Sequence, residues 1–313
     1  MRGKPRPEAA ARIVDRLKLH RYRLWLDGRR PYTVVTLRPG ADARFSTNFH
    51  HGTWHILSDW HGARLLGRLL WGLAYQRVPG TLLLIDRPFL DPNPFDGEPA
   101  DPIALVPTLI TPLTGKAARE LRHQLPLRGP GEGTVRWHTH GLDAAVAARR
   151  AERDRPMGSW HPPWIQPRGF QERMDRIGGL VTLSATPAVL REYAAYLYTL
   201  GDYHYRGMAY AEIDWPNGEV QIFRDYRRRV SAARVARREV LAELPYPLAP
   251  DSLNPLIWQR GTEVRHQRRR RASPSAARVT SPPRTSPPTR HGNTESETTP
   301  YGRRTEPDDA LAP

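Results

Sequence analysis

The sequence predicts an α/β fold: a mixed sheet with a central parallel part, antiparallel hairpins at its edges and helices on its faces, followed by a disordered C-terminal tail. Strand and helix patterns alternate through the middle of the chain, and hairpin patterns stand at both ends of its body. The composition then changes near Gly261. We expect one α/β domain over residues 1–260, with 155–170 as the place for any subdivision, and a basic tail rich in Ser, Pro, Thr and Arg over 261–313.

The first predicted elements are a helix, a hairpin and a second helix. Apolar residues recur at helical spacing in 8–20, whereas 21–26 alternate polar and apolar and 32–37 are β-branched. The turn residues between the last two segments predict a hairpin. Asp59 or Ser58 can cap a helix over 60–76, whose broad leucine stripe indicates burial.

The middle of the chain predicts the centre of the sheet. Residues 80–86 form an apolar run, the pattern of a strand buried on both faces. Residues 91–102 are rich in proline and acids, which predicts a surface loop. Further strands are predicted at 103–106 and 134–139, and helices at 115–124, capped by Thr114, and at 142–153. Residues 155–170 carry four prolines without periodicity, which predicts an aromatic loop or a hinge.

The last part of the body predicts a strand at 180–184, a helix that opens at Pro187, a hairpin over 208–226 and a final helix over 227–244. A proline-rich linker follows to about residue 259. Beyond Gly261 there are too few apolar side chains to offset the backbone entropy of ordering, about 1–2 kcal/mol per residue. The tail is therefore expected to be disordered.

The chain is strongly basic, with a net charge of +16. Residues 261–313 hold ten arginines and six acids, a net +4, so most of the excess lies before Gly261. Only three of the 48 basic residues are lysines, which with abundant Ala, Pro and Gly indicates a GC-rich genome such as an actinobacterial one. A field of this sign favours polyanions such as nucleic acid.

The location of the protein follows from what the sequence lacks. No cysteine is present, which excludes disulfides and thiolate chemistry. The N-terminal segment has no apolar h-region, and no run approaches the ~20 apolar residues that cross a bilayer. We expect a soluble cytoplasmic protein without membrane insertion.

Three residues are candidates for catalysis. Asp86 and Ser184 each end a predicted strand, where open α/β sheets place ligand sites. His138 shares a strand face with Arg136 and His140, a set that suits phosphate or carboxylate better than a metal ion. Together these groups would act on an anionic small molecule. The alternatives are a turn or ion-pair role for Asp86 and an exposed polar strand face for His138.

Metal and cofactor sites are not expected. His51 and His55 have the spacing of a helical metal site, but Gly52 and Thr53 argue against a helix there. The phosphate-loop, dinucleotide and nucleophile-elbow motifs are all absent from the sequence.

The basic signal recurs in two places near the C-terminus. The predicted last helix carries Arg234 and Arg238 on one face, and a second cluster follows after the linker: Arg268, Arg269, Arg270 and Arg271. A basic helix and tail of this kind would bind phosphates with little base preference. The alternative is a solvated face on which Glu239 and Glu243 pair locally. We therefore expect a non-catalytic nucleic-acid binder; an enzyme at the strand ends and an adaptor acting through the tail are the other hypotheses.

Overall fold

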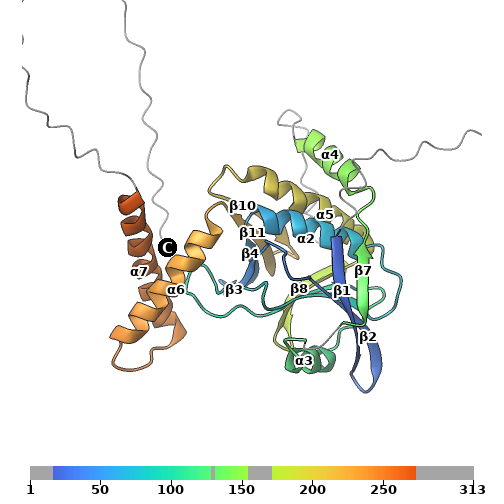
Figure 1. The fold of residues 1–313 in the computed structure, drawn as a ribbon, viewed down its shortest axis with the longest axis horizontal. Coiled ribbons are helices and arrows are strands. Elements are labelled where there is room, and N and C mark those ends of the chain that lie inside the picture. The colour runs from blue at the N-terminus through green and yellow to red at the C-terminus, as the bar shows by residue number, and fades with distance from the viewer. Residues whose placement is uncertain (1–16, 128–130, 154–170, 273–313) are drawn as a thin grey trace, which may run out of the picture. The chain divides into compact units, whose positions relative to one another are not determined.

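The fold is α/β, built on two mixed sheets (Figure 1). The computed structural model describes residues 17–127, 131–153 and 171–272. By its contacts the chain divides into Met1–Ala272 and Ser273–Pro313, and only the first unit is described below.

Sheet A has seven strands in the order β7-β1-β2-β5-β6-β9-β8. The pairs β2·β5 and β6·β9 are parallel and all other neighbours in this sheet are antiparallel. Its strands are β1 (Leu17–Leu26), β2 (Arg30–Thr36), β5 (Thr81–Ile85), β6 (Ile103–Pro107), β7 (Gly133–Trp137), β8 (Glu172–Ile177) and β9 (Leu180–Ala185).

Sheet B has four strands in the order β10-β11-β4-β3, with β4 and β11 parallel. It joins the hairpin of β3 (Phe45–His50) and β4 (Thr53–Ser58) to the hairpin of β10 (Met208–Ile213) and β11 (Gly218–Phe223). The second hairpin was predicted from its turn residues and is confirmed. The first was not predicted.

Among the described residues, six α-helices and one short 3₁₀ turn accompany the two sheets. They are α2 (Trp60–Leu73), α3 (Gly115–His123), α4 (Leu142–Arg153), α5 (Pro187–Leu200), α6 (Tyr226–Glu243) and α7 (Pro250–Ala272), with a short 3₁₀ turn, η3, at Gly201–Tyr203. Asp59 caps α2 and Thr114 caps α3, as predicted. Figure 1 shows α3 on one side of sheet A, and α2 and α5 on the other.

The alternation along the strands divides the core. Leu83 and Leu105 lie in the main core with α2, α5 and the inner side of sheet B, whereas Leu82 and Leu84 lie in a smaller core under α3. Successive strand residues point to opposite faces, so a strand covered on both sides is apolar throughout. This explains why β5 was recognisable from its sequence.

Several predictions are wrong in detail. Residues 17–20 belong to β1 and not to a helix, and β8 was not foreseen. The predicted surface loop at 91–102 is partly buried, with Asn93 and Asp96 only 3% and 4% exposed. The predicted linker and the start of the tail form α7, which passes through Gly261 to Ala272. The predictions for residues 8–16, 155–170 and 273–313 fall on segments outside the described residues.

Candidate functional site

Helix α6 is fixed to sheet B at its first residue. Tyr226 is fully buried, and its hydroxyl lies 2.6 Å from Ser46 Oγ on β3. Its ring packs with Leu57, Phe223 and Val230 in a small apolar cluster. Burial raises the pKa of Tyr226, so the hydroxyl stays neutral. The start of α6 is therefore held against the sheet at a defined point.

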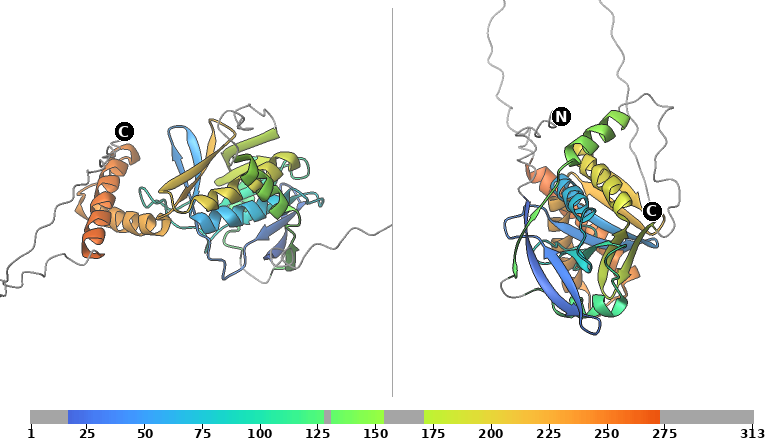
Figure 2. Two further views of the ribbon diagram at one scale, coloured as in Figure 1. Left: turned by 90° about the horizontal axis from the view of Figure 1, so that it is seen from above. Right: turned by 90° about the vertical axis from the view of Figure 1, so that its right-hand side faces the viewer.

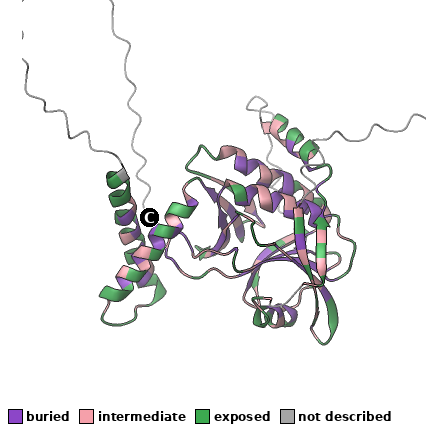
Figure 3. Ribbon diagram, viewed as in Figure 1, coloured by how far each residue is buried: buried purple, intermediate pink, exposed green. Residues whose placement is uncertain are grey.

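Helix α7 folds back on α6, and the two helices lie side by side in Figures 1 and 2. They run antiparallel, because Arg260 pairs with Glu243 and Arg268 with Ser231. Their shared apolar cluster comprises Ala236, Val240, Leu253 and Ile257. Gly261 faces this contact, because a Cβ built there would lie 3.8 Å from Ala236 Cβ. The sides of the helices that face each other are buried and the outward sides are exposed (Figure 3).

The two glutamates on α6 pair with α7 and not with their own helix. Arg260 of α7 contacts Glu239 at 3.2 Å and Glu243 at 2.8 Å. It also contacts Glu263 at 3.4 Å. These contacts use the acidic groups that were the alternative partners for the α6 arginines, which removes the hypothesis of local pairing on α6.

The antiparallel arrangement brings the end of α7 beside the start of α6. Arg268 Nη1 donates to Ser231 Oγ at 3.1 Å. Arg265 lies close enough to Arg229 that burial and the positive charge of Arg229 lower its pKa. Arginines from residues 224–229 and 265–271 are thus gathered at one end of the helix pair.

A hollow of ≈ 730 Å³ opens at this end, and we call it the arginine cleft. Its walls include the aromatic pair Trp60 and His61, whose ring centroids are 3.5 Å apart, and three aspartates. The arginines that line it are Arg224, Arg227, Arg228, Arg229 and Arg269.

Some of these arginines have structural partners. Arg227 Nε lies 3.4 Å from Asp59 Oδ2, and Arg229 Nε donates to Asp225 Oδ1 at 2.6 Å while stacking on Phe223. Further along α6, Arg237 contacts the carbonyl of Asp96 and the carboxylate of Glu98. These three arginines hold α6 to the rest of the fold.

Six further arginines of α6 and α7 are exposed and form no ion pair among residues 17–127, 131–153 and 171–272: Arg228, Arg234, Arg238, Arg269, Arg270 and Arg271. Arg234 and Arg238 share the outer face of α6 with Arg227, as the helical spacing predicted. Arg268 to Arg271 were expected in a disordered tail, but they form the last turn of α7. Their positive charges there lie next to the partial negative charge at the C-terminal end of the helix, which is a favourable interaction.

No signal in the sequence predicted the cleft itself. Arg224 and Trp60 were not predicted as site residues, because they meet Arg269 only through the packing of α7 on α6. The cleft could have been predicted only if residues 250–272 had been recognised as a helix.

The structure separates the three catalytic candidates. Asp86 follows β5 and Ser184 is near the end of β9, but β5 is antiparallel to β6 and β6 is parallel to β9. The carboxyl ends of β5 and β9 therefore lie at opposite ends of the strands of sheet A. His138 follows β7, three strands away from β5. The predicted joint site of Asp86, His138 and Ser184 is not formed.

Each of these residues has its own local setting. Asp86 lines a small hollow of ≈ 180 Å³ with His20 and Tyr22, and burial raises its pKa. Ser184 Oγ donates to the carbonyl of Arg173 at 3.3 Å. Arg136, His138 and His140 are exposed while Trp137 and Thr139 are buried, which is the polar strand face of the alternative interpretation.

The histidine-rich segment forms the β3–β4 hairpin. His51 and Gly52 occupy its turn with φ of 50° and 81°, so the helical spacing of His51 and His55 does not apply. Within the described part of the chain, no group of three His, Asp or Glu side chains is placed to hold a metal ion.

No helix among the described residues is long and apolar enough to cross a membrane. No family model, curated protein or solved structure matches this chain.

Proposed function

We propose that the protein binds nucleic acid through phosphate contacts to the arginine cleft and the adjoining outer face of α6. The observation that carries this proposal is the convergence of arginines from α6 and α7, while Glu239, Glu243 and Glu263 of these helices pair with Arg260. A guanidinium presents two parallel donors to a phosphate, and exposed arginines without carboxylate partners are available for such contacts.

This mode of binding has little sequence preference. Contacts to phosphates position a protein on nucleic acid but do not read bases. The affinity is expected to fall linearly with salt on logarithmic axes, with a slope of about −0.9 per phosphate neutralised on duplex DNA. No cofactor or metal is needed for it.

The test is fluorescence anisotropy of labelled duplex DNA and single-stranded RNA with the full chain, titrated across salt. The variant Arg228→Ala/Arg234→Ala/Arg269→Ala removes three exposed side chains that make no ion pair among the described residues. Its stability should stay within about 0.5 kcal/mol per substitution. The salt slope on duplex DNA should become shallower by about 3.

The matched control removes three exposed arginines from the sheet A side: Arg21→Ala/Arg77→Ala/Arg119→Ala. It makes the same change in net charge and should leave the slope nearly unchanged. A flat salt response of the unaltered protein, or an equal loss in both triple variants, would overturn the proposal.

A further inference from the structure

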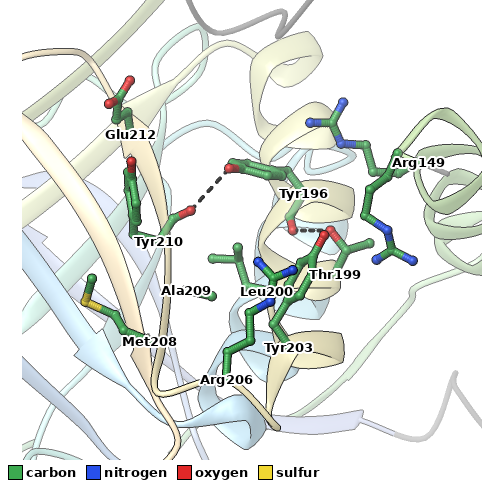
Figure 4. Close-up of a pocket in the computed structure, with 11 residues that line it drawn as sticks. Arg149, Tyr196, Thr199, Leu200, Tyr203, Arg206, Met208, Ala209, Tyr210 and Glu212 are labelled. Atoms are coloured by element: carbon green, nitrogen blue, oxygen red, sulfur yellow. Dashed lines mark hydrogen bonds between the residues drawn. The ribbon is translucent and has the colours of Figure 1, made fainter. Parts of the chain in front are cut away.

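A second hollow lies next to the arginine cleft, between α5 and β10 (Figure 4). Its volume is ≈ 380 Å³, within the ~300–1000 Å³ range of small-molecule pockets. Tyr196, Tyr203 and Tyr210 line it from α5, η3 and β10 respectively. We call it the tyrosine pocket.

One short segment forms a wall of both hollows. Gly207 lines the arginine cleft, while its neighbours Arg206 and Met208 line the tyrosine pocket. Arg224 of the cleft is bonded to the same segment, since its backbone N–H donates to the carbonyl of Gly207 and its guanidinium to that of Tyr205, both at 3.2 Å. The tyrosine pocket and the arginine cleft therefore meet at this segment.

The pocket combines aromatic faces with positive charge. Arg206 Cζ lies 4.7 Å from the ring centroid of Tyr203, and Arg149 Cζ lies 4.9 Å from that of Tyr196. Tyr210 is half exposed, so its ring is accessible. Arg206 forms no ion pair in the part of the chain that the structure describes. Rings and guanidinium planes of this kind are what unpaired bases stack on.

The pocket is also polarised along its length. Glu212 lies at one end and Arg206 at the other, as Figure 4 shows. Tyr196 donates its hydroxyl to the carbonyl of Tyr210 at 3.2 Å, and burial raises its pKa to about 12, so it remains a neutral, fixed wall. A base with an amino group would meet an acceptor at the Glu212 end, while its phosphate would meet the guanidinium of Arg206.

We infer that the tyrosine pocket takes an unpaired base of a strand whose phosphates lie on the arginine cleft, so that the preferred ligand is single-stranded nucleic acid. This inference rests on the proposed function. A base within a duplex is paired and stacked and would have to be flipped out before it could enter such a pocket. Duplex DNA should therefore bind through the arginines alone.

The test compares Tyr210→Ala with Tyr210→Phe in the full chain. The substitution to Ala removes an exposed ring and leaves intact the backbone carbonyl that Tyr196 contacts, whereas Phe keeps the ring. Affinity for single-stranded RNA should fall at least fivefold in Tyr210→Ala and change little in Tyr210→Phe. Affinity for duplex DNA should be unchanged in both variants.

A second measurement uses the unaltered protein, so the inference stays testable if the Ala variant misfolds. A labelled cytidine oligomer should bind at least fivefold more tightly than an abasic sugar-phosphate oligomer of the same length and charge. Equal affinity for the two oligomers, or an equal loss for RNA and duplex in Tyr210→Ala, would overturn the inference. The proposed function would survive that result if the arginine triple variant still showed its altered salt slope.

Discussion

Replacing Tyr226 by phenylalanine removes one hydroxyl from the junction between α6 and sheet B. Ser46 Oγ lies 2.8 Å from the carbonyl oxygen of Pro92 and 3.0 Å from that of Asp91, and a hydroxyl has one hydrogen to donate. The Ser46 hydroxyl therefore donates to the loop and accepts from Tyr226 at 2.6 Å. Because Ser46 both donates and accepts while Tyr226 only donates, removing the Ser46 hydroxyl should destabilise the protein more than removing the Tyr226 hydroxyl.

The consequence is a predicted order of stabilities. Tyr226→Phe removes one buried hydrogen bond but leaves the Ser46 donor satisfied, so it should lower the free energy of unfolding by about 1 kcal/mol. Ser46→Ala leaves the buried Tyr226 hydroxyl without its acceptor and the loop carbonyls without a donor, which should cost about 2 kcal/mol. The double variant removes both hydroxyls and should cost about as much as Ser46→Ala alone, a coupling of about 1 kcal/mol.

Urea unfolding, followed by tryptophan fluorescence and far-UV circular dichroism, measures all three values if the slope of free energy against urea is unchanged. The midpoint of thermal unfolding should fall by about 2–4 °C for each kcal/mol. Strict additivity of the two substitutions, or a larger loss for Tyr226→Phe than for Ser46→Ala, would refute the assigned direction of the hydrogen bond.

Two further predictions concern other buried sites. Gly72→Ala should lower the free energy of unfolding by about 1–3 kcal/mol, because a Cβ there would overlap the indole of Trp137; circular dichroism melting would show the loss, and an unchanged midpoint would contradict the packing. Burial raises the pKa of Asp96 to about 6, so the folded protein holds this proton more tightly than the unfolded chain does. Tighter proton binding by Asp96 therefore stabilises the folded protein fully below about pH 4. This stabilisation, about 3 kcal/mol, is lost as the pH rises to about 6. Asp96→Asn should remove this part of the pH dependence in urea titrations at pH 4 and 7, and a parallel pH profile in both proteins would contradict it.

Local signals in the sequence located the elements whose ends or turns have a chemical signature. Asp59 and Thr114 accept from helix N–H groups, and Pro187 stands at the first position of α5. Pro250 also stands at the first position of a helix, where its missing N–H costs nothing. The prolines of this stretch predicted a linker, and one of them, Pro255, lies inside the helix, where proline is normally unfavourable. Packing of Leu253 and Ile257 against α6 outweighs that penalty.

The arrangement of the candidate sites could not be predicted in the same way. Whether Asp86 and Ser184 meet depends on the direction of β6, which runs antiparallel to β5 and parallel to β9. Nothing in the apolar run of β6 encodes its direction. The arginine helix was visible from the spacing of Arg234 and Arg238, whereas its partner surface depends on contacts between distant parts of the chain.

The apolar clusters of this fold also set the order in which its parts open. Sheets A and B share one main core with α2 and α5, so neither sheet can separate without exposing it. Helices α6 and α7 depend instead on two small clusters around Tyr226 and Ile257. Backbone amides in α6 and α7 should therefore exchange with deuterium through a sub-global opening of lower free energy than global unfolding. Because a bound strand would stabilise only the closed form, slower exchange confined to these helices would report its occupancy.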